Sequence, residues 1–338
     1  MADSGGHWLN LAEAQKLSLT NLIPGVVDED KLRMPLAPLF PIFQALGTTT
    51  TWNRTDGTRR ALRAAVGDEL LNRDVESYTQ MTRTLRIMYD QSLLNNYVAS
   101  VYGNINNYRA VRLKELQASV WKTLNDAIVY DDGTYDGTHG EGLHALAYAH
   151  GVLDANLSLD EGGGLSITNL RTMLRAMKNG TDAFIFPFEI AQRLDAYLQE
   201  AGIASWVGPG QFAFSKDDIG VRVSGFDGVP IIRTDYLVAE EAATGEGTNA
   251  KAKYSTGTKE YSVFGVKFGQ VAEDSAGVTL GFGTNGDDES GLFRVEFNEK
   301  LPQYDADQLR FITYWNLLDG SRYSVARIHG ITDVAVVA

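Results

Sequence analysis

Two aspartates with an arginine between them are the first residues in this sequence that could do chemistry. Asp227, Arg233 and Asp235 lie in the stretch 225–237, which reads GFDGVPIIRTDYL. A pair of carboxylates can act as general acid and general base. The same stretch also suits a structural role, because its Asp-Gly pair favours a tight turn and residues 229–232 form a short apolar strand. We expect Asp235 to cap the next turn, Arg233 to pair across the strand, and all three to serve structure or subunit contact.

The remaining motifs lack a part that their chemistry needs. Residues 281–286 (GFGTNG) match the dinucleotide fingerprint, but three acidic residues follow where a helix should begin, and these would repel a phosphate. Residues 132–137 resemble the start of a calcium loop, yet its twelfth position is Leu143 instead of glutamate. His139, His144 and His150 are five and six residues apart, so they do not share a helix face. The sequence therefore predicts no catalytic residue, no cofactor and no metal site.

Composition excludes several classes of protein. The 338 residues carry a net charge of −13 and include no cysteine, so disulfides and thiolate chemistry are excluded. A strongly acidic chain is a poor candidate for binding the phosphates of a nucleic acid directly, although it can form a container around a nucleic acid. No apolar run is long enough to span a membrane, and the N-terminus does not have the pattern of a signal peptide.

The order of predicted elements indicates an α+β protein. Apolar residues at steps of three and four from Leu113 to Ile128 predict a long amphipathic helix over 104–130. Shorter helices are predicted at 167–178 and 187–200. Predicted strands, mostly in the C-terminal half, are 76–92, 182–186, 261–268, 277–282, 291–297, 308–318 and 321–328. Residues 238–260 are small and polar and predict a surface loop.

The N-terminal part has apolar side chains but no obvious core of its own. Four prolines interrupt residues 24–41, and residues 47–75 predict an exposed, extended hairpin with a turn at Asp56-Gly57. Extended segments of this kind often bury their side chains on a neighbouring subunit. We therefore predict contacts between subunits at Leu36, Leu39, Phe40, Phe43, Trp52, Arg54, Arg59, Arg60 and Arg63.

The succession of segments resembles the major capsid proteins of tailed bacteriophages, which share the Johnson fold. The most specific segments are AFIFPFEIAQRLDAYLQEAG, VSGFDGVPIIRTDYL, GLFRVEFNEKL and SRYSVARIHGITDV, in that order and after a long helix. The resemblance covers nearly the whole chain. It implies a structural protein, not an enzyme, that assembles with itself into pentamers and hexamers of an icosahedral shell around double-stranded DNA. Such a chain is made in the host cytoplasm, ends in the virion, and contacts no membrane.

The resemblance also implies a division of the chain. It consists of an N-terminal arm (1–46), an E-loop (47–75), a peripheral domain (76–142) with its spine helix at about 104–130, an axial domain (143–290), return strands of the peripheral domain (291–325), and a C-terminal axial strand (326–338).

Two departures from the family pattern change what is expected. Some members cross-link through an E-loop lysine, but residues 32–113 contain no lysine, so we expect a non-covalent shell whose boiled subunits migrate as one band. A helical scaffolding domain ahead of the arm is also missing. A separate scaffolding protein is therefore expected, unless such a domain is removed beforehand, together with a portal and in some cases a decoration protein.

Two other readings remain open on the sequence. An encapsulin-like bacterial nanocompartment has the same fold and holds enzymes instead of DNA. A cytosolic enzyme that uses the carboxylates of Asp227 and Asp235 belongs to a different class and would form only a small oligomer. The extended loop and the proline-rich arm favour the phage capsid.

Overall fold

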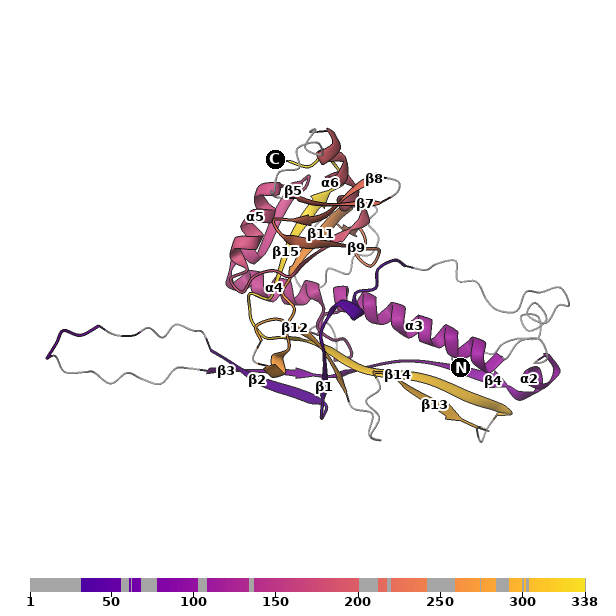
Figure 1. The fold of residues 1–338 in the computed structure, drawn as a ribbon. Coiled ribbons are helices and arrows are strands. Elements are labelled where there is room, and N and C mark those ends of the chain that lie inside the picture. Colours follow the sequence, from indigo (N-terminus) through magenta and orange to yellow (C-terminus); the bar gives the residue numbers. More distant parts are fainter. Residues whose placement is uncertain are drawn as a thin grey trace.

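The structure is a computed structural model, and it describes most of the chain. The described residues are 32–55, 61, 63–67, 78–102, 108–133, 137–200, 212–217, 220–241, 259–273, 275–283, 292–299, 301 and 304–337. Figure 1 shows a body with two sheet-containing units, from which a narrow two-stranded ribbon extends to one side. Within the described residues, no helix is long and apolar enough to cross a membrane.

The first unit is a five-stranded sheet with a long helix on one face. The central strand β14 (Ala306–Asp319) pairs with β4 (Arg86–Asn95), β13 (Arg294–Asn298) and β12 (Val278–Gly283), and β12 pairs in parallel with β1 (Ile42–Ala45). The helices α2 (Asn96–Tyr102) and α3 (Tyr108–Tyr130) follow β4. Leu116 and Val120 of α3 form a buried cluster with Leu309 and Phe311 of β14. This contact places α3 along the sheet.

The long helix confirms the prediction from periodicity. It ends at Tyr130 as expected, and its first described residue is Tyr108, because residues 103–107 lie outside the described part of the chain. The predicted stripe is the buried one, since Leu116, Val120, Leu124 and Ile128 are all at most 5% exposed. Side chains three and four apart share a helix face, which is why this pattern could be read from the sequence.

The second unit is an eight-stranded sheet with helices packed against it. Its order is β5 (Ser158–Gly163), β15 (Val325–Thr332), β11 (Lys259–Val266), β6 (Ala183–Pro187), β9 (Val229–Thr234), β8 (Gly220–Phe226) and β7 (Phe212–Asp217), with β10 (Glu240–Glu241) beside β11. The helices are α5 (Ile167–Ala176) and α6 (Phe188–Glu200). A core of buried side chains joins them to the sheet, with Leu170, Leu194, Phe184 and Ile328 fully covered. The helices predicted at 167–178 and 187–200 and the strands predicted at 182–186 and 261–268 are confirmed, whereas the strand predicted at 321–328 lies at Val325–Thr332.

A helix that the sequence pattern did not predict joins the two units. The helix α4 (Leu143–Leu153) lies between them in Figure 1, and the 3-10 turn η2 (Ala155–Leu157) follows it. Its sequence, LHALAYAHGVL, is apolar or small on nearly every side, so it shows little periodicity. The other 3-10 turns are η1 (Ala37–Leu39) and η4 (Val271–Glu273).

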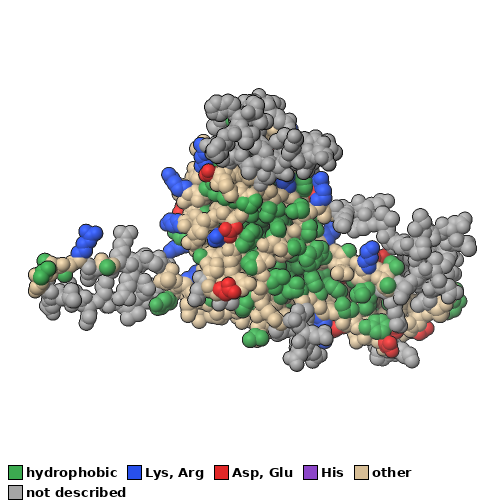
Figure 2. All heavy atoms as spheres, viewed as in Figure 1, with side chains coloured by type: hydrophobic (Ala, Val, Ile, Leu, Met, Phe, Trp, Pro, Cys, Tyr) green, Lys and Arg blue, Asp and Glu red, His purple; other side chains and the backbone are tan. Residues whose placement is uncertain are grey.

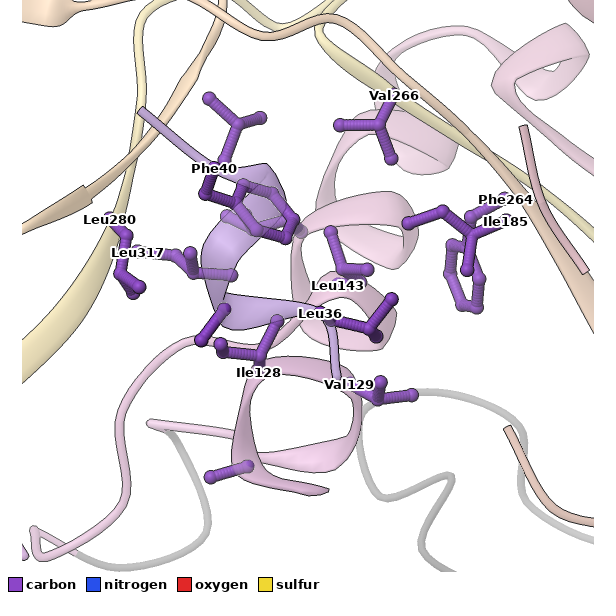
Figure 3. Close-up of a cluster of buried hydrophobic side chains, with 14 of the residues drawn as sticks. Leu36, Phe40, Ile128, Val129, Leu143, Ile185, Phe264, Val266, Leu280 and Leu317 are labelled. Carbon is purple, nitrogen blue, oxygen red and sulfur yellow. The ribbon is translucent and has the colours of Figure 1, made fainter. Parts of the chain in front are cut away.

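The segment 32–45 is a packed part of the body, which corrects the prediction of a free arm. Leu36 is 0% and Phe40 is 3% exposed, and both lie in the chain's own core beside Leu143 and Ile128 (Figure 3). These two residues are therefore wrong as predicted subunit contacts, because the ends of α3 and α4 supply the burial that a neighbour was expected to supply. The sequence also predicts a short amphipathic helix over residues 11–19, which lies outside the described residues.

The third sheet is a two-stranded ribbon made of β2 (Thr49–Thr55) and β3 (Tyr78–Thr84). The strand predicted at 76–92 is confirmed and is divided into β3 and β4. Thr55 pairs with Tyr78, so residues 56–77 connect β2 to β3. The turn predicted at Asp56-Gly57 lies outside the described residues. We call β2 and β3 together the hairpin.

Strand pairing also moves one predicted domain boundary. The strand β12 was assigned to the domain of residues 143–290, but it pairs with β1 and β14 in the five-stranded sheet. The stretch that matches the dinucleotide fingerprint begins inside this strand, because Gly281, Phe282 and Gly283 are strand residues. Residues 284–290 lie outside the described part.

The stretch 225–237 is architectural, as predicted, although its ion pairs differ from those expected. Asp227 and Gly228 both have positive φ, 50° and 83°, as a tight turn between β8 and β9 requires. Arg233 binds Asp195 of α6 at 2.6 and 2.8 Å, which is a helix-to-strand contact. Asp235 does not cap a turn. It accepts hydrogen bonds from the backbone and side chain of Arg33, and this fastens the segment 32–45 to the eight-stranded sheet.

Candidate functional site

The hairpin has two chemically different faces because side chains alternate along a strand. One face is turned toward the body and carries Trp52, Arg54, Met81 and Arg83, all of which are half-buried. The opposite face is fully exposed. Its side chains are uncharged, and most of them are threonine: Thr49, Thr51, Asn53, Thr55, Tyr78, Gln80, Thr82 and Thr84.

Both long edges of the hairpin are open within the described part of the chain. β2 pairs with β3 over Thr49–Thr55 and with no other described strand. Unpaired strand edges present free N–H and C=O groups, and proteins usually cover or charge them. A ribbon of two strands is also only marginally stable by itself in water. The hairpin therefore has the form of an element that is completed by a partner.

The inner face of the hairpin is fastened to the body by charged side chains. Arg54 binds the carboxylate of Asp319 at 2.5 Å and also donates to the Asp319 carbonyl. Arg83 lies 2.9 Å from Glu141 and 3.4 Å from the second oxygen of Asp319. Asp319 is the last residue of β14, and its side chain is only 3% exposed. We call Asp319, Arg54, Arg83 and Glu141 the hairpin anchor.

The electrostatics of the anchor favour an ionised Asp319. Burial by itself would raise the pKa of this carboxyl group, but the hydrogen bond to His150 and the charges of Arg54 and Arg83 lower it to about 2. The pKa of Glu141 is raised, chiefly by burial, although Arg83 opposes the shift. Asp319 is therefore the charge that holds both arginines.

A second buried ionic cluster lies in the body, away from the hairpin. Glu240 accepts hydrogen bonds from Ser262 Oγ at 2.6 Å and from Arg327 Nη2 at 2.8 Å, and His144 Nε2 lies 2.6 Å from its other oxygen. Burial would raise the pKa of Glu240, but these partners lower it to about 2. The ring of His144 stacks on Tyr130 at the end of α3. We call this the core cluster. It joins α3, α4 and the eight-stranded sheet.

The structure places the remaining predicted contact residues in different environments. Arg63 is exposed, whereas Leu39 and Phe43, within the segment 32–45, are half-buried. The guanidinium group of Arg54 is bound to Asp319 of the same chain, and its predicted contact with another subunit stays a prediction. Trp52 is half-buried on the inner face. Arg59 and Arg60 lie outside the described residues.

Sequence reasoning missed Asp319, His150, Glu141 and Arg83, which form or contact the anchor. One partial signal was available, since Met81 and Arg83 alternate with polar residues along a predicted strand. Nothing in the sequence could have shown that residue 319 meets residues 54 and 83. Their contact requires the pairing of β14 with β4 and of β2 with β3.

Asp227 and Asp235, which the alternative enzyme reading would use as a carboxylate pair, lie in different environments. Asp227 is an exposed turn residue, and Asp235 is bound by Arg33. Across the described residues, no three His, Cys, Asp or Glu side chains gather in a way that could hold a metal ion.

Solved structures with the same fold are shell proteins. The chain aligns with the holo-SrpI encapsulin complex of Synechococcus elongatus PCC 7942 (TM-score 0.63, 12% identity, 97% of this chain and 98% of that one). It aligns with the capsid of a native GTA particle (TM-score 0.59, 10% identity, 92% of this chain and 96% of that one). It also aligns with the capsid of cyanophage P-SCSP1u (TM-score 0.59, 9% identity, 93% of this chain and 93% of that one). The chain thus has the fold that phage capsid, GTA capsid and encapsulin proteins share, as the sequence resemblance predicted.

Comparisons of sequence alone add little. No protein-family model matches the chain. A segment of 84 residues is 31% identical to a ribonuclease H of Acidovorax sp. (strain JS42), which is 25% of this chain and 55% of that protein. The chain therefore spans about half the length of this curated relative.

Proposed function

We propose that this chain is the major capsid protein of a tailed bacteriophage, a structural subunit that assembles with itself into the icosahedral shell of a virion. The hairpin is the observation that carries the proposal. It projects from the body, has open edges and an uncharged outer face, and belongs to a chain with the fold of shell proteins. An element of this form is suited to bind a second copy of the same chain.

Charge supports a second copy as the partner of the hairpin. Each chain carries a net charge of −13, so charged contact faces of one sign would repel between copies. The outer face of the hairpin avoids this because none of its side chains between Thr49 and Thr55 is charged. Hydrogen bonds from threonine and from the open strand edges can then join the copies without opposing charge.

The body also offers surface for such contacts. Figure 2 shows that apolar side chains gather over a broad area of the body, with the charged side chains lying mostly around it. On the outer side of β4, Ile87 and Tyr89 are 59% and 60% exposed. Large exposed apolar areas are typical of protein–protein interfaces. In a ring of subunits each of these contacts can be weak, because many are made together.

In this proposal the parts of the chain take the roles that the capsid family implies. The five-stranded sheet and α3 form the peripheral domain with its spine helix, the eight-stranded sheet forms the axial domain at the centre of pentamers and hexamers, and the hairpin with residues 56–77 is the E-loop. A scaffolding protein, a portal and possible decoration proteins are the other partners. The lumen holds double-stranded DNA, and the acidic chain suits a container that must not bind the polyanion along its length.

Electron microscopy of the chain expressed with its genomic neighbours tests the proposal. We expect closed particles from which nuclease-protected duplex DNA is recovered when the packaging proteins are present. Subunits boiled in detergent should run as one band near 37 kDa. A small soluble oligomer and no particle under any of these conditions would contradict the proposal.

An encapsulin-like shell is the second candidate, and one specific observation favours it. The alignment with the encapsulin complex has a TM-score of 0.63 and covers 97% of this chain. The material inside particles from the native source separates the two candidates. Packaged duplex DNA supports the capsid, and a folded cargo enzyme supports the encapsulin.

Charge reversal in the E-loop tests whether its arginines contribute to assembly. We expect Arg59→Glu with Arg60→Glu to leave the chain folded but to weaken shell formation, and high salt to mimic part of the defect. Each exposed pair contributes only about 0–1 kcal/mol, but the change is repeated at every copy. Circular dichroism measures the fold, and light scattering measures assembly.

A matched control is available on the body. Arg171→Glu with Arg175→Glu makes the same change in charge at two exposed positions of α5. Normal assembly of the Arg59/Arg60 variant at low salt would show that these arginines are only a solvated surface.

A further inference from the structure

Three parts of the molecule meet at the side chain of Asp319. The residue itself ends β14 of the five-stranded sheet. From the hairpin, Arg54 and Arg83 reach its two carboxylate oxygens. From α4, His150 places Nε2 at 3.3 Å from Oδ2, and its Nδ1 donates to the carbonyl of Val325 in β15, a strand of the eight-stranded sheet. One carboxylate is therefore shared by the hairpin and both sheets.

The two arginines attach the hairpin to Asp319 from different points along the length of the hairpin. Arg83 pairs with Thr50, next to the base of the ribbon, whereas Arg54 pairs with Thr79, near its outer end. The backbone bond from Leu85 to Thr48 and the side-chain bond from Asn316 to Thr84 act only at the base. The hairpin is therefore attached near its base and near its outer end, with Asp319 common to both attachments, and this fixes the direction in which the hairpin leaves the body. Attachment at the base alone would fix only the point from which it leaves.

Several buried polar groups of the hairpin and of the neighbouring Arg86 contribute nothing to holding it. Among the described residues, no hydrogen-bond partner is found for the Nε–H groups of Arg54, Arg83 and Arg86, the Trp52 indole N–H or the Thr50 hydroxyl. Buried polar groups are nearly always paired, so this contact is poorly matched apart from its ion pairs. Asp319 and Glu141 therefore supply the specific contacts of the inner face. Asp319 is the more buried of the two, with 3% of its side chain exposed against 18% for Glu141.

We propose that Asp319 is a positioning residue: its buried carboxylate holds the hairpin in one direction relative to both sheets and so sets where the hairpin meets a second copy. The link through His150 and Val325 ties that direction to the placement of the two sheets. The consequence for assembly rests on the proposed function, whereas the consequence for the hairpin does not. The low pKa of Asp319 is consistent with this role, since the carboxylate stays charged in neutral solution.

Hydrogen exchange of the unassembled full-length chain tests the positioning directly. In Asp319→Asn we expect backbone amides of Thr49–Thr55 and Tyr78–Thr84 to exchange at least about tenfold faster, which corresponds to about 1.4 kcal/mol. Amides of α3 and β6, away from the hairpin, should keep their wild-type rates. Glu296→Gln is the matched control, because Glu296 also pairs with arginines of the five-stranded sheet but does not touch the hairpin.

A second variant keeps the test valid if Asp319→Asn fails to fold. Arg54→Met removes one of the two hairpin arginines that bind Asp319, and it should also speed hydrogen exchange of the backbone amides in the hairpin. In the double variant the two effects should not add, because both remove the same contact. Unchanged exchange of the hairpin in Arg54→Met, or simple additivity in the double variant, would overturn the proposal.

The assembly readout separates this inference from the proposed function. We expect Asp319→Asn chains to form few particles or misshapen ones, while Glu296→Gln chains form normal particles. If the wild-type chain forms no particle, the proposed function fails and the exchange experiment still decides the role of Asp319. If hairpin exchange rises but particles remain normal, the claim that direction controls assembly is wrong.

Discussion

Chains in which a two-residue turn replaces residues 56–77 are expected to fold normally but to form very few closed shells. Thr55 and Tyr78 are paired in register, so an Asn-Gly turn can join them directly in place of residues 56–77. The change leaves Arg54, Arg83 and the anchor in place. We expect particle yield to fall by more than about a hundredfold, because each lost contact of about 1.4 kcal/mol costs a factor of ten and is repeated at every copy.

The measurement is particle counting by electron microscopy beside thermal unfolding of the unassembled chain. A matched deletion exists in the body. Glu241 and Lys259 are antiparallel partners, so the same Asn-Gly turn can replace residues 242–258. We expect that control to assemble. Normal particles from the variant that lacks residues 56–77 would remove this segment from the proposed assembly mechanism.

Loss of the Glu240 charge is expected to have the largest effect on the stability of the body. Glu240→Gln leaves Arg327 and His144 buried without their anion, and breaking a buried ion pair of this kind costs about 3–5 kcal/mol. The midpoint of chemical unfolding at pH 7 should therefore shift strongly to lower denaturant. Glu115→Gln removes an exposed carboxylate that pairs with Arg112 on α3, and it should change the midpoint little.

The same cluster predicts how stability responds to acid. The pKa of Glu240 falls from an ordinary 4.5 to about 2 in the folded chain, so the ionised carboxylate contributes fully to the free energy of unfolding above pH 4.5. This stabilisation is lost as the pH falls through about 2, and by linkage it amounts to roughly 3 kcal/mol. The difference in the free energy of unfolding between wild type and Glu240→Gln should disappear over this pH range. A difference that stays constant from pH 7 to pH 2 would contradict the low pKa of Glu240 in the folded chain.

Local periodicity determined most secondary structure of this protein. The stripe Leu116, Val120, Leu124 and Ile128 is the buried face of α3, and the Asp227-Gly228 pair makes the turn between β8 and β9 as its residue types require. Such features depend on neighbours within a few positions, so they can be read from the chain. The helix α4 could not be predicted from periodicity, because apolar residues occupy both its buried and its exposed sides; Val152 and Leu153, for example, are 71% and 62% exposed.

Only the tertiary structure decided what becomes of the individual side chains. The apolar residues Leu36 and Phe40 looked as if they needed a neighbouring subunit, but the ends of α3 and α4 cover them. Arg54 looked free to bind another copy, but Asp319 lies beside it, 265 positions along the chain. The sequence determined which side chains alternate between the faces of each strand. The pairing of distant strands determined which face the body covers, because that pairing depends on long-range contacts that no local pattern encodes.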